Sequence, residues 1–181
     1  RDFVKEAFRA LDEKKAAGLI IDLRGNGGGH DEYAKLLFAH VMDRPFLYYA
    51  ALETKKDAYD LFKYTNETPQ GREELAKQVR KNALGRFDVI GHPNTGLQRP
   101  EEPRFVGRVA ILIDGGSFSA TGETTSLFHY YKKAVFFGEE CGAGYYGNTS
   151  GFMVTATLPH SRIQVRVPLV LYKMAVDGYP K

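Results

Sequence analysis

A short apolar segment that runs directly into a glycine-rich loop constrains this 181-residue chain more than any other feature. Residues 18–29 read GLIIDLRGNGGG, and the apolar stretch Leu19–Leu23 is interrupted only by Asp22. Such a stretch predicts a buried strand. The glycines that follow allow positive φ angles and leave backbone N–H groups uncovered, so these groups can converge on a ligand. An apolar strand, a glycine loop and then a helix is how α/β proteins build pockets for anions and oxyanions.

A second apolar strand, Val109–Ile113, is followed by a turn that contains serine. Residues 114–116 (DGG) break this strand, and Ser119 opens a predicted helix that ends near Lys132. Ser119 therefore lies at a helix N-terminus, where free amides and the helix dipole favour negative charge. A nucleophilic serine needs its oxyanion stabilised, and the Ala120 N–H is placed to do so. The alternative is that Ser117 or Ser119 only caps the helix, since serine is a preferred N-cap.

Together these segments resemble the tail-specific, or C-terminal processing, serine peptidases. Residues 20–29 (IIDLRGNGGG) look like the family signature DLRxNxGG, and residues 117–120 (SFSA) look like its nucleophile motif. Residues 135–139 (VFFGE) match the strand and GE turn that follow the nucleophile helix, and residues 142–151 and 158–161 also resemble one branch of the family. The resemblance covers residues 1–50 and 105–181, whereas residues 51–104 match nothing in the family.

The resemblance implies that Ser119 is the acylated nucleophile and that the amide of Ala120, with an amide within Gly27, Gly28 and Gly29, forms the oxyanion hole. It implies an α/β fold, with a crotonase/ClpP-like αββ superhelix core that carries a largely helical insertion. It also implies a polypeptide substrate, often gripped near its C-terminus, no cofactor, and an exported, for example periplasmic, location.

One position departs from the family pattern. Many members use a Ser-Lys dyad, and ungapped matching places Gly144 where that lysine falls, with no lysine between Lys133 and Lys173. A Ser-Lys mechanism from that loop is therefore excluded, which leaves resemblance to the tricorn-like branch. That branch pairs serine with a histidine and an acidic residue, and its histidine usually lies upstream of the glycine-rich strand.

None of the five histidines is a clear general base. His30 follows the glycine loop, where it either faces the pocket or starts the next helix; the others are expected in packing, surface or turn positions (His40, His92, His129, His160). We therefore expect a base from outside this chain, and weak or no activity from residues 1–181 alone. Glu139 is expected to anchor its loop by hydrogen bonds, with an acid/base role as the alternative. Glu123 is expected to bond back to a cap amide.

Composition excludes several classes of protein. The formal net charge is +3 and basic residues are interleaved with acidic ones, so no nucleic-acid surface is indicated. No apolar run reaches the length of a membrane span. The single cysteine, Cys141, excludes an intrachain disulfide and leaves the compartment open. No His/Cys cluster has metal-ligand spacing, and the glycine loop lacks the ending of a Walker A nucleotide site. The oligomeric state stays open.

The pattern predicts one domain, residues 1–181, as a fragment of a peptidase catalytic domain. Helices are expected at 2–17 and 31–43, a strand at 46–52, helical structure at 55–84 with a break at 68–71, a long loop at 85–104, a hairpin at 151–158 and 162–168, and a strand at 169–174. Residues 53–104 are expected to be an insertion that acts as a lid or is a plain surface elaboration.

Two other functions fit parts of this pattern. A binding module on the same fold would use the many Phe and Tyr residues to hold apolar ligands or peptides. It would have no reason, however, to present Ser119–Ala120 beside a glycine loop. A crotonase-type acyl-thioester enzyme shares the oxyanion chemistry but needs no serine nucleophile. An acyl-enzyme on Ser119 would distinguish the peptidase from both.

Overall fold

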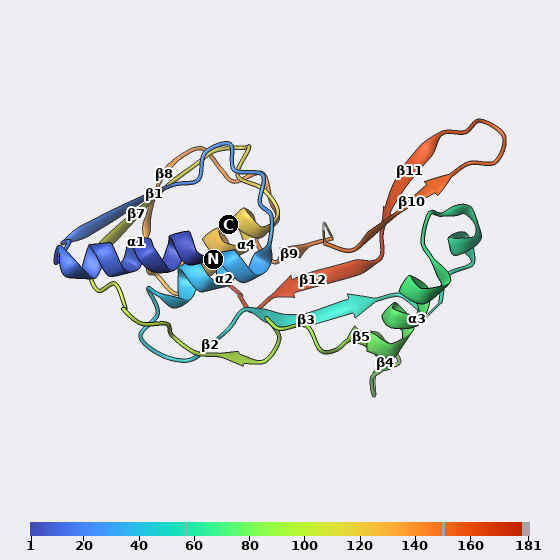
Figure 1. Ribbon diagram of the computed structural model, residues 1–181, viewed down its shortest axis with the longest axis horizontal. Helices are drawn as coiled ribbons and strands as arrows, with labels where there is room; N and C mark the ends of the chain where they lie inside the picture. The colour runs from blue at the N-terminus through green and yellow to red at the C-terminus, as the bar shows by residue number, and fades with distance from the viewer. Residues whose placement is uncertain (57, 150, 179–181) are drawn as a thin grey trace. The chain divides into compact units, whose positions relative to one another are not determined.

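The computed structural model describes residues 1–56, 58–149 and 151–178 (Figure 1). The chain divides into two compact units. The first comprises Arg1–Ala50, Pro93–Gly147 and the C-terminal residues from Met174; the second comprises Ala51–His92 and Asn148–Lys173. Both chemical motifs of the sequence, the glycine loop and the serine turn, belong to the first unit.

A three-stranded parallel sheet organises the first unit. Its strands are β1 (Gly18–Asp22), β7 (Arg108–Ile113) and β8 (Val135–Gly138), in the order β1-β7-β8. Ile21 is paired with Ile111, and Ile111 with Phe136. Because neighbouring parallel strands end at the same edge, the loops after β1 and β7 emerge side by side, which brings the glycine loop to the serine turn.

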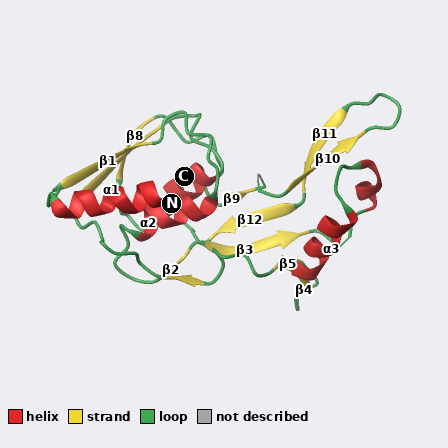
Figure 2. Cartoon of the chain, viewed as in Figure 1, coloured by secondary structure: helices red, strands yellow, loops and turns green. Residues whose placement is uncertain are grey.

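Helices α1 (Asp2–Glu13), α2 (Asp31–Ala39) and α4 (Ala120–Tyr130) belong to the same unit as this sheet (Figure 2). Side chains alternate between the faces of each strand. Val109 and Ile111 on the inner face are buried, whereas Ile20, Val135 and Phe137 on the outer face are exposed. The short antiparallel pair β2 (Phe46–Leu47) and β6 (Leu97–Gln98) completes the first unit.

Helix α4 is buried from Ala120 to Phe128, although half of this stretch is polar. The hydroxyl groups are satisfied by carbonyl and amide oxygens: Thr124 donates to Ala34 O (2.8 Å), Thr125 to Gly122 O (3.0 Å) and Ser126 to Glu123 O (2.8 Å). Burying these groups without partners would destabilise the fold. The helix that carries the serine turn is therefore held centrally in its unit by apolar packing and by hydrogen bonds together.

The second unit contains a mixed set of elements. Its helical segments are η1 (Asp60–Tyr64) and α3 (Pro69–Gln78), and its strands include β4 (Val79–Lys81) and β5 (Phe87–Val89). These two strands belong to a sheet of order β4-β5-β3-β12-β9. The other strands of this sheet have their end residues Tyr49, Met174 and Gly147 in the first unit: β3 (Tyr49–Thr54), β12 (Val170–Met174) and β9 (Gly147–Asn148). The predicted hairpin is confirmed as β10 (Met153–Thr157) paired antiparallel with β11 (Gln164–Pro168).

Several predicted limits were wrong for local reasons. Helix α1 ends before Ala17, because Lys15 takes a positive φ of 48° and the Ala16 N–H donates to Leu11 O. Helix α2 ends at Ala39 rather than at residue 43, and the strand predicted at 46–52 is divided into β2 and β3.

The predicted helical segment 55–84 is only partly helical, so the insertion is not largely helical. The break expected at 68–71 is the start of α3: Thr68 is its N-cap and accepts a hydrogen bond from the Gly71 N–H (3.1 Å), and Pro69 is its first residue. Proline is favoured at that first position because its missing N–H would have no intrahelical partner there. The loop expected at 85–104 contains β5 and β6.

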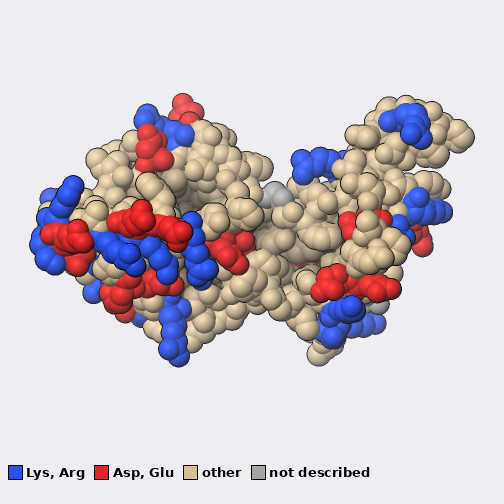
Figure 3. Space-filling view, viewed as in Figure 1, with Lys and Arg blue, Asp and Glu red and all other residues tan. Residues whose placement is uncertain are grey.

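Charged side chains of both signs are intermixed over the face drawn in Figure 3, where blue and red atoms alternate along α1. None of the helices in the described part of the chain has both the length and the hydrophobicity of a membrane span.

Candidate active site

Ser119 lies at the turn between β7 and α4 and has an unusual backbone conformation. Its φ is 54° and its ψ is −127°, and it occupies the N-cap position of α4 without a side-chain capping bond. The lack of a side-chain capping bond argues against the alternative that Ser119 only caps the helix. Positive φ is disfavoured for residues with a Cβ and is found where the structure requires a sharp turn. Such a strand-to-helix turn is how α/β hydrolases present a nucleophilic serine.

Ser117, the other candidate cap, joins the two loops. Its hydroxyl donates to Leu23 O (2.8 Å) at the end of β1 and accepts from the Asp114 N–H (3.1 Å). The Asp114 carboxylate in turn accepts from the Gly25 N–H (2.8 Å) and the Gly116 N–H (2.9 Å). These bonds, that from the Gly25 amide first, lower the pKa of Asp114 below its ordinary value of 3.8. The loop after β7 thus donates a hydrogen bond to the end of β1 through Ser117, and accepts one from the loop after β1 through Asp114.

Asn26 holds the glycine loop against the serine turn. Its backbone carbonyl accepts from the Phe118 N–H (3.0 Å), and its side-chain oxygen accepts from the Thr121 hydroxyl (2.9 Å) and the Gly28 N–H (3.0 Å). The sequence shows Asn26 among glycines, which indicates a turn but gives no sign of this long-range role.

Gly28 makes the closest approach between the two loops. It has a φ of 95°, and a Cβ added to it would lie 2.7 Å from the Ser119 Cβ and 2.8 Å from Ala120 N. Only glycine fits at this position. Because the Gly28 N–H already donates to Asn26, the better candidates for an oxyanion donor in this loop are the amides of Gly27 and Gly29. Gly29 also has a positive φ, of 143°.

A small pocket of about 240 Å³ lies on this side of α4. Gly28, Gly29, His30 and Ala120 line it together with parts of α1 and α2. His30 is exposed at the N-cap of α2, and its ring lies edge-to-face with Tyr33 at 5.5 Å. The structure thus brings His30 and most of the predicted oxyanion residues to one pocket.

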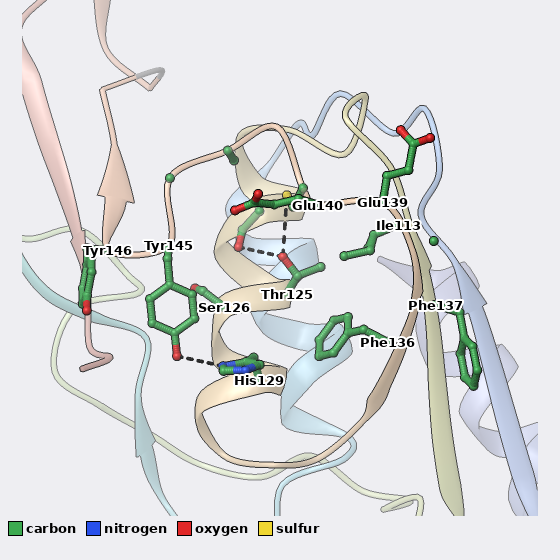
Figure 4. Close-up of a pocket in the computed structure, with 15 residues that line it drawn as sticks. Ile113, Thr125, Ser126, His129, Phe136, Phe137, Glu139, Glu140, Tyr145 and Tyr146 are labelled. Carbon is green, nitrogen blue, oxygen red and sulfur yellow. Dashed lines mark hydrogen bonds between the residues drawn. The ribbon is translucent and has the colours of Figure 1, made fainter. Parts of the chain in front are cut away.

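Glu139 lies on the other side of α4, at a larger pocket of about 690 Å³ (Figure 4). Its N–H donates to Ile113 O (3.1 Å), which anchors the start of the loop. Its carboxylate is exposed and points away from α4 in Figure 4. Gly144 and Cys141 line the same pocket, with Phe136 and Tyr145 among its aromatic residues.

The remaining histidines have structural or surface surroundings. His40 is fully buried, stacks on Phe8 at 4.3 Å and shares a hydrogen bond with Pro103 O (3.0 Å). His129 is exposed and hydrogen-bonds the Tyr145 hydroxyl (3.1 Å), as Figure 4 shows. His160 is exposed, and the ring of His92 lies edge-to-face with Tyr172.

Two further acidic residues have defined partners. Asp22 pairs with Arg24 at 2.7 Å, the pair is exposed, and the hydrogen bond from Arg24 lowers the pKa of Asp22 to about 2. The bond from Glu123 back to a cap amide stays a prediction. The Glu123 carboxylate is buried and accepts from the Tyr48 hydroxyl (3.1 Å) and the Tyr49 hydroxyl (2.8 Å). Within the described residues, no group of three or more His, Cys, Asp or Glu is arranged to hold a metal ion.

The arrangement combines a serine at a strained turn, a helix N-terminus and a glycine loop, which is the class of site used for acyl transfer. A family model for peptidase family S41 matches residues 1–169. The chain therefore belongs to peptidase family S41, and the predicted relationship to C-terminal processing peptidases is confirmed. The tricorn-like branch stays a prediction.

Individual relatives agree with this assignment. The chain is 32% identical over 108 residues to the carboxy-terminal processing protease CtpB of Bacillus subtilis, covering 52% of this chain and 22% of that protein. A solved structure from Parabacteroides merdae is similar with a TM-score of 0.56 at 21% identity, over 90% of this chain and 41% of that one. The photosystem II D1 C-terminal processing protease is similar with a TM-score of 0.52 at 16% identity, over 93% of this chain and 33% of that one.

The chain thus spans less than half the length of each of these relatives. The structural similarity confirms a mixed α/β fold of the kind found in these proteins. The crotonase/ClpP-like superhelix stays a prediction.

Proposed function

We propose that this chain carries the nucleophile and oxyanion hole of a serine endopeptidase that cleaves polypeptides near their C-termini. The observation that carries the proposal is the positive φ of Ser119 at the N-terminus of buried α4, with Gly28 packed against it. A serine in that conformation costs about 1–3 kcal/mol. Such strain persists where the surrounding structure imposes it, and here it turns the serine out of the helix instead of letting it cap.

The chemistry follows from the position of the amides. The Ser119 hydroxyl attacks the scissile carbonyl, and the negative charge that develops on its oxygen is stabilised by the Ala120 N–H and by a loop amide, Gly27 or Gly29. The first amides of a helix lack intrahelical partners, and the helix dipole adds a favourable field there. Fixed donors of this kind are often the largest single contribution to acyl-transfer catalysis.

The substrate class is inferred from the relatives. CtpB and the D1 protease are both named as C-terminal processing proteases, which supports a polypeptide substrate cut near its C-terminus. We place the general base outside residues 1–181, because Gly144 stands where the dyad lysine is expected and no lysine lies between Lys133 and Lys173.

A fluorophosphonate probe tests this function directly. The full-length protein is treated with the probe, and the adduct is located by peptide mass, with Ser119→Ala as the control. A stoichiometric adduct on Ser119 that the variant lacks would support an activated serine. A folded protein that forms no adduct would overturn the peptidase proposal and make binding of apolar ligands or peptides the working hypothesis.

A further inference from the structure

Two tyrosines and a glutamate lie buried near the serine turn, and the chemistry proposed above does not explain them. Tyr48 is 0% exposed, Tyr49 2% and Glu123 4%. All three belong to the first unit: Tyr48 lies between β2 and β3, Tyr49 is the first residue of β3, and Glu123 is in the first turn of α4. Burying a carboxylate is costly unless hydrogen bonds compensate for the lost water, so a cluster of this kind needs a reason.

The Tyr49 hydroxyl lies between two carboxylates that belong to different helices. It is 2.8 Å from Glu123 Oε2 on α4 and 2.9 Å from Asp31 Oδ2 at the start of α2. Asp31 also accepts from the Asn94 side-chain amide (3.0 Å). The Tyr48 hydroxyl donates to the same oxygen of Glu123 (3.1 Å), and the charge of Asp31 acts on it only as a further cause of its raised pKa. Burial first, and then the Glu123 charge, raise the pKa of Tyr49 far above its ordinary value of 10, so its hydroxyl keeps its single proton and shares it between the two carboxylate oxygens.

The two carboxylates belong to the two helices that follow the glycine loop and the serine turn. Asp31 is the first residue of α2 and follows Gly29 and His30 in the chain. Glu123 follows Ser119 by one helical turn, and its N–H donates to Ser119 O (3.0 Å). A shift of α2 against α4 would therefore move the glycine loop relative to the serine turn.

We propose that the bridge Asp31–Tyr49–Glu123 is a positioning device that holds the glycine loop at a set distance from Ser119 and Ala120. Asn26 links the two loops at their tips, whereas this bridge links the helices on which the loops end. Oxyanion donors must be held within a few tenths of an ångström of their working geometry, because a misplacement of 1 Å can reduce the rate by about 100-fold. The catalytic part of this inference rests on the function proposed above.

Two tyrosine variants of the full-length protein test the bridge. Tyr49→Phe removes the carboxylate bridge between the helices and leaves the Thr124–Ala34 hydrogen bond in place. Tyr48→Phe is the matched control, because it removes a buried hydroxyl from the same carboxylate oxygen and leaves the bridge intact. We expect Tyr49→Phe to slow fluorophosphonate labelling of Ser119, and to lower kcat for a peptide substrate with KM unchanged, by about tenfold or more. Tyr48→Phe should stay within about threefold of the native protein.

Hydrogen exchange provides a second measurement that does not depend on the reactivity of Ser119. Amides of residues 25–30 and 118–121 should exchange faster in Tyr49→Phe than in Tyr48→Phe, at matched thermal stability. Equal labelling and equal exchange in the two variants would overturn the proposal. A native protein that forms no Ser119 adduct, but shows the difference in exchange, would overturn the proposed function and leave the bridge standing. If Tyr49→Phe does not fold, Asp31→Asn breaks the far end of the same link, and native-like labelling and exchange in that variant would overturn the bridge.

Discussion

The two sides of α4 have very different constructions. On the glycine-loop side, Asn26, Asp114 and Ser117 link the neighbouring loops after β1 and β7 by hydrogen bonds that are mostly to main-chain groups. Asn26 also lines a pocket of about 240 Å³. On the other side, the loop 139–146 and aromatic residues such as Phe136 and Tyr145 surround a pocket of about 690 Å³. Hydrogen bonds on the first side fix the backbone geometry of the two loops, whereas the second side contains the larger cavity. An active site of the proposed kind needs its geometry fixed only where charge develops.

The largest effect is expected from filling the contact between the two loops. Gly28→Ala would place a Cβ against the Phe118 carbonyl, the Ser119 Cβ and Ala120 N, at a φ of 95°. We expect labelling of Ser119 to fall by about 100-fold and stability by roughly 1–3 kcal/mol. Gly115→Ala is the matched control, because a Cβ there has no neighbour within 4 Å. Equal behaviour of the two variants, in labelling and in thermal unfolding, would contradict the close approach.

A smaller effect is expected from the same substitution on the two sides of α4. Thr121→Val removes a donor to Asn26 on the glycine-loop side, whereas Thr125→Val removes a bond to Gly122 O within the helix itself. Thr121→Val should cost about 1–2 kcal/mol and slow labelling, while Thr125→Val should cost less than about 1 kcal/mol and leave labelling unaffected. Denaturant unfolding and probe kinetics measure both. If Thr125→Val slows labelling more than Thr121→Val does, the inferred difference between the two sides of α4 is wrong.

A third prediction concerns the thermal stability of the protein at low pH. The pKa of Asp114 is lowered in the folded protein, so its contribution to stability is complete above the unfolded value of 3.8 and is lost as the pH falls through the lowered value. Asp114→Asn should therefore remove part of the decrease in thermal stability that the native protein shows as the pH falls below 3.8. If the thermal stability of the variant and of the native protein falls equally with pH, the hydrogen bond from Gly25 to Asp114 does not contribute to the acid dependence.

The smallest effect is expected at the exposed pair near the end of β1. Arg24→Gln should raise the pKa of Asp22 from about 2 toward 3.8, because the hydrogen bond from Arg24 is the main cause of its lowering. Thermal stability at neutral pH should change little, since exposed ion pairs contribute little. Carboxyl titration by NMR measures the shift, with Asp43, whose pKa is lowered by Lys133, as an internal control that should not move. An unchanged pKa of Asp22 in the Arg24→Gln variant would show that Arg24 is not the cause of its lowering.

Local pattern was enough to predict the first unit in outline. The apolar runs before Gly25 and Asp114 were predicted as strands, and the structure pairs them in parallel, with their glycine and serine loops adjacent. The prediction worked because both signals are local: an apolar run of strand length followed by residues that end a strand. The second unit was harder. The Thr68–Pro69 dipeptide was interpreted as a break when it starts α3, and short strands such as β4 and β5 carry too few residues for a pattern to emerge.

The residue pattern alone specified the chemistry: an apolar strand, glycines, a serine before a helix, and a motif that identified the family. How these groups are used depends on the fold. The φ of Ser119, the donation of the Gly28 amide to Asn26, and the position of Tyr49 between Asp31 and Glu123 all depend on contacts between residues far apart in the chain. The physical reason is that a buried polar group takes whichever partner the packing supplies, and no local pattern records where that partner lies.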